Sequence, residues 1–121
     1  MEYDDFRNMH VWQLAFKLVI KIYEVTADFP IEERFGMTSD MRRAANSVVH
    51  NIAEGYGRYE KKDKTRFYKI SRGSCYELMS QSLVSCELKF MDAQVSEEIV
   101  NDNKEIIKEL NRLIKTVEKN I

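Results

Sequence analysis

The chain has 121 residues, of which 44% are hydrophobic and 32% charged, and its net charge at neutral pH is −1. This balance excludes an intrinsically disordered chain and a general polycation. One proline and four glycines supply little turn material, so we expect long helices in a single domain over residues 1–121. No segment approaches the roughly 18 consecutive apolar residues of a membrane span, and the acidic first residues do not form a signal peptide.

The two cysteines, Cys75 and Cys86, have neither metal-ligand spacing nor a Cys or His companion nearby. We interpret them as small buried thiols in a reducing compartment. The sequence therefore predicts a cytoplasmic protein without a metal, a cofactor or a membrane partner.

The first helix is predicted from about residue 10 to 28, after a short N-terminal arm. Its apolar stripe has helical spacing and consists of Trp12, Ala15, Phe16, Val19, Ile22, Tyr23 and Thr26. Phe29-Pro30 ends the helix, because the residue before a proline avoids helical backbone. In the loop that follows, Phe35 is expected to be a buried anchor.

The second helix is predicted from about residue 39 to 57, with Thr38 or Ser39 as its cap. An apolar stripe and a polar stripe lie side by side on it. The apolar stripe is Met41, Ala45, Val48 and Ile52, and the polar stripe is Arg43, Ser47, Asn51, Glu54 and Arg58. We interpret the polar stripe, together with Glu77, as a structural hydrogen-bond network, with a functional surface as the alternative.

The third helix is predicted from about residue 63 to 91, with Asp63 as its cap. One face carries mostly small residues, which lets a neighbouring helix approach closely: Phe67, Ser71, Ser74, Leu78, Ser82 and Ser85. The short loop that follows implies an antiparallel neighbour.

The fourth helix is predicted from about residue 96 to 120, starting at Ser96. Two apolar rows run along it. The first is Ile99, Asn103, Ile106, Leu110, Leu113 and Val117, and the second is Val100, Ile107, Ile114 and Ile121. Two rows are more than one bundle partner needs, so the second row predicts a subunit interface, with deeper burial as the alternative.

The positive charge is concentrated in the middle of the chain, where residues 42–72 include nine basic and three acidic residues. The candidate nucleic-acid-binding residues are Arg58, Lys61, Lys62, Lys64, Arg66, Lys69 and Arg72. Tyr59, Tyr68 and Tyr76 lie among them and offer rings on which bases stack. The alternative interpretation is a solvated helix face.

Catalysis has one candidate pair, Arg43 and His50, which lie seven residues apart on one helix face. Some small helical ribonucleases use an Arg and a His at about this spacing. No second acid, base or metal set converges with His50 in the sequence, so a ribonuclease is only a minor alternative and we expect no enzyme. Gly55-Tyr56-Gly57-Arg58 follows a helix rather than a strand, which indicates a helix end and not a phosphate loop.

Four helices with mostly short connections predict an all-α fold, a left-handed up-down-up-down four-helix bundle. The blocks Arg42-Arg43-Ala44-Ala45 and Asn51-Ile52-Ala53-Glu54-Gly55, with Val11-Trp12-Gln13-Leu14-Ala15, resemble a bacterial four-helix-bundle family. That family is often encoded in intervening sequences of large-subunit ribosomal RNA genes, and the resemblance covers about residues 6–91.

This resemblance implies a ring-like homopentamer around a central channel. It also implies similarity to the accessory protein of diversity-generating retroelements, a basic pentamer that engages a reverse transcriptase and nucleic acid. We therefore predict a non-enzymatic homo-oligomer that binds RNA, DNA or a nucleic-acid enzyme through its basic surface. A structural scaffold that binds a protein partner and no nucleic acid is the alternative.

Overall fold

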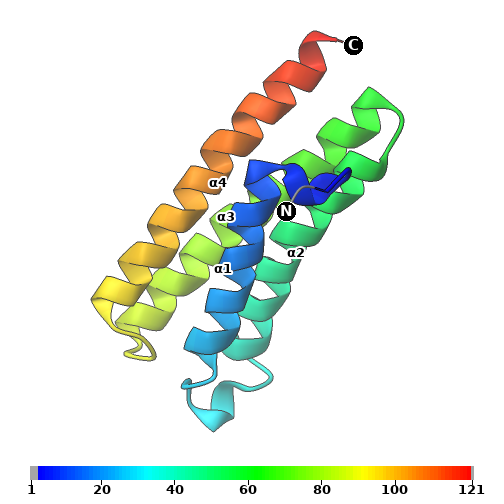
Figure 1. Ribbon diagram of the computed structural model, residues 1–121. Coiled ribbons are helices and arrows are strands. Elements are labelled where there is room, and N and C mark those ends of the chain that lie inside the picture. Colours follow the sequence, from blue (N-terminus) through cyan, green and yellow to red (C-terminus); the bar gives the residue numbers. More distant parts are fainter. Residues whose placement is uncertain (1–2, 121) are drawn as a thin grey trace.

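The computed structural model describes residues 3–120, which form four α-helices (Figure 1). They are α1 (His10–Thr26), α2 (Met37–Gly57), α3 (Lys61–Glu87) and α4 (Ala93–Lys119). Two short 3-10 turns, η1 (Phe6–Asn8) and η2 (Ile31–Glu33), precede α1 and α2. Residues 3–120 contain no strand, so the all-helical prediction is confirmed. None of the helices in this part of the chain combines the length and the apolar content needed to cross a bilayer.

The helices lie side by side in Figure 1. α2 packs against α1 and α3, and α4 packs against α3 and α1, whereas α1 and α3 lie diagonally opposite one another. The connections 27–36 and 88–92 lie at one end of the molecule, which we call the two-loop end, and the connection 58–60 lies at the other, which we call the tip (Figure 1). The C-terminal halves of α1 and α3 are therefore both near the two-loop end, on opposite corners.

Helices α2, α3 and α4 begin earlier than predicted. α2 starts at Met37 because the Glu33 carboxylate accepts the Met37 amide at 3.0 Å, so the expected cap at Thr38 or Ser39 is not needed. α4 starts at Ala93 because Asp92 caps it, accepting the Val95 amide at 2.8 Å. α3 begins two residues before Asp63, at Lys61.

Helices α1 and α3 also end earlier than predicted. α1 stops at Thr26 instead of residue 28. α3 stops at Glu87 instead of residue 91, because Lys89 has a φ of 67°, in the left-handed region that ends a helix. The chain can then turn directly into α4.

The most extensive helix contact joins α2 and α3, and small side chains take part in it. Ser71 is buried and its hydroxyl donates to the Val48 carbonyl at 2.7 Å. Near the tip, the buried Tyr68 ring lies against Gly55, which has no side chain to hold it away. Cys75 of α3 is also buried, and burial raises the pKa of its thiol to about 12. The small-residue face predicted on the third helix thus lets a neighbouring helix approach closely, as expected.

The second apolar row of α4 does not form an exposed surface, and this prediction is wrong. Val100, Ile107 and Ile114 are all buried within the chain, because α4 contacts both α1 and α3 and therefore needs a wide apolar face. Ile121, the last member of the row, lies outside the described residues.

Two predictions near the start of the chain are also corrected. Phe16 and Tyr23 are 47% and 42% exposed, because α1 turns a neighbouring stripe that includes Leu18 toward the core. Phe35 is 86% exposed instead of buried. Phe29 has the anchoring role in its place, since it is buried with its ring centroid 5.5 Å from that of Phe90.

Candidate functional site

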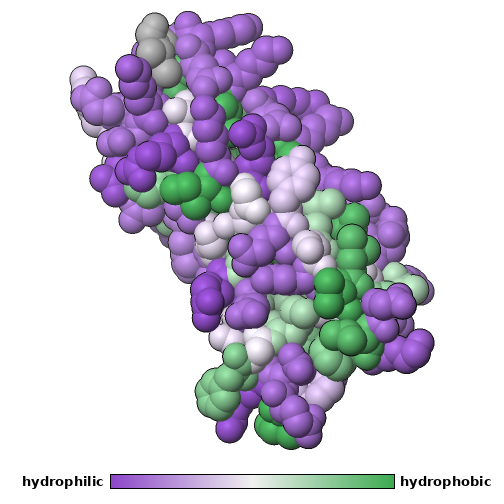
Figure 2. All heavy atoms as spheres, turned by 180° about the vertical axis from the view of Figure 1, so that it is seen from behind, coloured by the Kyte–Doolittle hydropathy of each residue, from purple (hydrophilic) through white to green (hydrophobic). Residues whose placement is uncertain are grey.

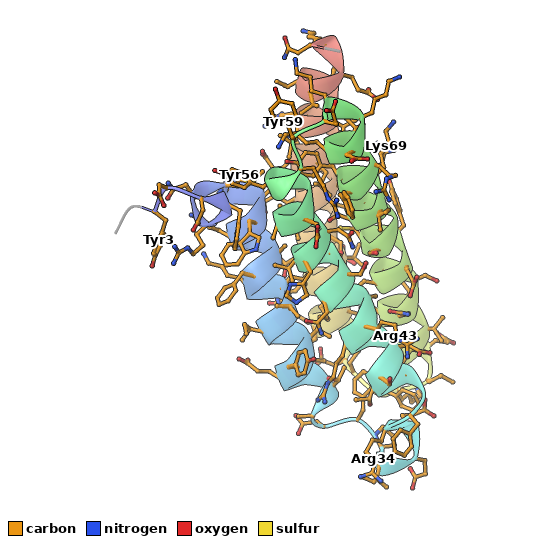
Figure 3. All side chains as sticks on the ribbon, turned by 90° about the vertical axis from the view of Figure 1, so that its right-hand side faces the viewer. Tyr3, Arg34, Arg43, Tyr56, Tyr59 and Lys69 are labelled. Atoms are coloured by element: carbon orange, nitrogen blue, oxygen red, sulfur yellow. The ribbon has the colours of Figure 1, made fainter. Side chains whose placement is uncertain are left out.

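The outward side of the first half of α3 carries three of the predicted basic residues. Lys62, Arg66 and Lys69 line one shallow depression, and Figure 3 shows Lys69 pointing away from the bundle. Lys69 pairs with Glu118 at 3.0 Å, and Arg66 lies 3.7 Å from Asp63. Both pairs are solvent-exposed and therefore weak, so a phosphate can replace the carboxylate at little cost.

Three other predicted basic residues make hydrogen bonds that join segments of the fold. Lys64 donates to the Gly55 and Tyr56 carbonyls at 3.2 and 2.8 Å, which places a cation at the negative end of α2. Lys61 donates to the Asn120 carbonyl at 2.6 Å, and Arg72 donates to the Asn111 side chain at 2.8 Å. These contacts make the three residues structural as well as charged.

The last predicted basic residue, Arg58, lies over the same phenylalanine ring as Arg66. Their guanidinium carbons are 4.6 and 4.4 Å from the Phe67 ring centroid, in cation–π geometry. Arg58 also pairs with Glu54 at 3.1 Å. Both arginines are recognisable as candidates in the sequence, but nothing in it indicates that both lie over Phe67.

The three tyrosines among the basic residues have different environments. Tyr59 is 92% exposed in the connection 58–60 and helps to line a second depression at the tip. Tyr76 is exposed farther along α3. Tyr68 is buried, which raises the pKa of its hydroxyl to about 12 and removes its ring from any surface.

The predicted polar network is divided in the structure. The Ser47 and Ser74 hydroxyls are 2.7 Å apart, and the Asn51 amide donates to the Ser47 hydroxyl at 3.0 Å. Glu54 pairs with Arg58 at 3.1 Å, as predicted. Two members have partners outside the predicted set: Arg43 lies 3.9 Å from Asp40, and Glu77 accepts from Gln81 at 3.1 Å. Of the six predicted members, Ser47 thus contacts Asn51 and Glu54 contacts Arg58, whereas Arg43 and Glu77 stand apart.

The candidate ribonuclease pair does not form a pocket. His50 and Arg43 are both exposed on α2, and the shallow depression beside His50 is lined by Ala53, Glu54, Gly57 and Arg58 but not by Arg43. Over residues 3–120, no cluster of His, Cys, Asp or Glu side chains is suited to hold a metal ion.

Two exposed apolar surfaces lie near the two-loop end, and sequence reasoning missed both. The α1 surface is Phe16, Ile20 and Tyr23. The α3 surface is Tyr76, Leu83, Val84 and Leu88. Figure 2 shows a hydrophobic patch at its lower right, over the second half of α3. The spacing of apolar residues reveals an apolar stripe on a helix. When a helix carries apolar residues on several sides, however, the spacing does not tell which side faces the core.

Residues 7–112 match the model of a family described as the 23S rRNA-intervening sequence protein. The chain belongs to this family. The resemblance seen in the sequence is thus confirmed, and it extends past residue 91 into α4. This family member is also similar to the crystal structure of a protein with unknown function from the S23 ribosomal protein family of Bacteroides thetaiotaomicron. That match has a TM-score of 0.78 and covers 87% of this chain and 98% of the other at 21% identity, so it shows a shared fold.

No curated protein matches the chain. Neither of the two matches indicates an enzyme family.

The sequence blocks that carry the family resemblance have packing roles in this member. Arg42 donates to the Thr26 hydroxyl at 2.9 Å and lies over the Tyr23 ring, so it joins α2 to α1. Ala44 and Ala45, which follow in the same block, are buried. These contacts indicate that the block Arg42-Arg43-Ala44-Ala45 serves to join α2 to α1 and not to carry out a reaction.

Proposed function

We propose that this member of the 23S rRNA-intervening sequence protein family assembles head to tail from several copies and binds nucleic acid through its basic tips. One observation carries the proposal: the outward side of α3 is basic in its first half, with Lys62 and Arg66, and apolar in its second half, with Leu83 and Val84. Copies that join through the apolar half place their basic halves side by side on one rim.

The two apolar surfaces support head-to-tail joining. They lie on opposite corners of one bundle at the same end, so the α1 surface of one copy can meet the α3 surface of the next. Their chemistry is complementary. Arg42 lies 4.6 Å from the Tyr23 ring centroid beside the α1 surface, whereas Glu77 and Glu87 flank Val84 at helical spacing. Repetition of a contact between two different surfaces closes into a ring when the rotation between copies allows it.

Nucleic-acid binding follows from this arrangement rather than from the charge of one chain. The whole chain has a net charge of −1, so a single copy attracts a polyanion only at its tip. Several tips on one rim bind the same strand together, and such multivalency raises affinity by about 10²–10⁴ without any new contact.

The finer features expected from the sequence form part of this proposal. They are a left-handed up-down-up-down bundle, five copies around a central channel, a cytoplasmic location and no catalytic activity. A scaffold that binds a protein partner is the second candidate, because the apolar surfaces account for assembly without any nucleic acid.

The test is a binding titration with a labelled 30-nucleotide RNA, followed by fluorescence anisotropy at low and moderate salt. We expect affinity to fall steeply with salt and to be lost when Lys62 and Arg66 are both replaced by Glu. Lys104→Glu/Lys108→Glu is the matched control, because it reverses two charges with the same spacing on exposed positions of α4. Binding by the Lys62/Arg66 variant as tight as by this control would refute the proposal. A flat wild-type titration with an intact assembly would select the scaffold.

A further inference from the structure

Tyr59 is an aromatic side chain that the fold does not use. It is 92% exposed at the tip, where Figure 3 shows it far from Arg34 at the two-loop end. The other tyrosines of this region have partners in the chain: Tyr56 meets the edge of the Phe6 ring at 6.3 Å, and Tyr68 is buried. Leaving a tyrosine ring in water forgoes the stabilisation that burial gives, so Tyr59 is suited to a ligand rather than to the core.

Three cations belong to the same end of the molecule as this ring. Lys62 follows Tyr59 by three residues, and both line the same depression at the tip. Arg58 precedes Tyr59 directly, and its guanidinium lies over the Phe67 ring, as does that of Arg66. The tip thus combines one free aromatic face with three cations drawn from the end of α2 and the start of α3.

We propose that the tip binds an unpaired stretch of nucleic acid, with one base stacked on Tyr59 and its neighbouring phosphates on Lys62, Arg58 and Arg66. This inference rests on the proposed function and names its ligand class, the single strand. The reason is geometric. In a duplex both faces of a base are covered by the bases above and below it, so a protruding aromatic ring can stack only on a base that is unpaired.

Two acidic residues set the strength of one such site. Glu60 and Asp63 lie beside Tyr59 and Lys62 in the same depression, and Asp63 faces Arg66 at 3.7 Å. The negative charges of Glu60 and Asp63 repel a phosphate, which weakens phosphate binding at a single tip. Tight binding therefore requires several tips on one strand, which the proposed assembly supplies.

The experiment compares three labelled ligands: an oligothymidine, the same strand annealed to oligoadenine, and an abasic strand of equal length. The variants are Tyr59→Ala and Tyr59→Phe, with Phe35→Ala as control, because Phe35 is equally exposed and lies 4.9 Å from the Arg34 guanidinium at the opposite end.

We expect Tyr59→Ala to weaken oligothymidine binding by about 5- to 150-fold for each tip that holds the strand, the range for losing one stacked base. Tyr59→Phe and Phe35→Ala should keep the wild-type affinity. The abasic strand should bind wild type and Tyr59→Ala equally, because it offers phosphates and no base.

Two outcomes separate this inference from the proposed function. If the wild type binds the duplex as tightly as the single strand, or if Tyr59→Ala binds oligothymidine like the wild type, the stacking inference is overturned while binding at the tips stands. If the wild type binds neither these three ligands nor the 30-nucleotide RNA, the proposed function fails and the inference fails with it.

Discussion

Replacement of Gly55 by alanine should destabilise the protein although alanine is the better helix former. Gly55 is buried near the end of α2. A Cβ atom at this position would lie 2.5 Å from Cε1 and 2.8 Å from Cδ1 of Tyr68. The Tyr68 ring is itself buried, so it has little space into which to move. The α2–α3 contact must therefore open to admit the methyl group.

The magnitude follows from two opposing effects. Alanine gains at most about 1 kcal/mol over glycine inside a helix, and less in the last turn. Forcing a methyl group into a well-packed contact costs about 1–3 kcal/mol. We therefore expect the free energy of unfolding to fall by about 1–2 kcal/mol. Gly57 is the matched control, because it lies in the same helix and its Cβ would meet nothing within 4 Å, so Gly57→Ala should be neutral or slightly stabilising.

The assay is urea denaturation followed by circular dichroism, with all variants at one protein concentration because assembly adds to apparent stability. Tyr68→Leu should reduce the penalty of Gly55→Ala in a double-mutant cycle, since the smaller side chain leaves room for the methyl group. The reasoning is refuted if Gly55→Ala is as stable as Gly57→Ala.

Two further predictions concern stability. The unfolding free energy should fall as pH rises above about 9, because burial raises the pKa values of Cys75 and Tyr68 to about 12 and the unfolded chain therefore ionises first. In urea titrations, Cys75→Ala should reduce the loss of unfolding free energy between pH 9 and pH 11 by about 2 kcal/mol. An unchanged dependence of the unfolding free energy on pH would contradict this. Ser47→Ala should cost about 1 kcal/mol. The double variant Ser47→Ala/Ser74→Ala should lose less unfolding free energy than the sum of the two single variants, because the two hydroxyls contact each other. Strict additivity would show that this contact is unimportant.

The sequence was sufficient to predict the four helices and much of how they pack. Their length follows from the scarcity of glycine and proline, and the small side chains at Ser71 and Ser74 indicated the close α2–α3 contact. The early start of α2 was not predictable, because its cap comes from Glu33, four residues upstream of Met37 in a 3-10 turn.

The site was less predictable, because the partners of a charged residue belong to distant segments. Lys64 and Arg66 look equivalent in the sequence, yet Lys64 closes the end of α2 while Arg66 lies over Phe67 on the outward side of α3. The exposed surfaces were hidden for a similar reason. Phe16 fits the apolar period as well as Leu18 does, and only the placement of α2 and α4 around α1 decides that Leu18 faces the core.

Head-to-tail assembly is tested most directly by the masses of two variants measured by light scattering, alone and mixed. Phe16→Glu disrupts the α1 surface and Val84→Glu disrupts the α3 surface, so each variant keeps one intact surface of a different kind. The account predicts a large assembly for the wild type, a monomer for each variant alone, and a one-to-one complex of two chains when they are mixed. Either variant forming a dimer or the wild-type assembly by itself, or a mixture that stays monomeric while the wild type assembles, would contradict it.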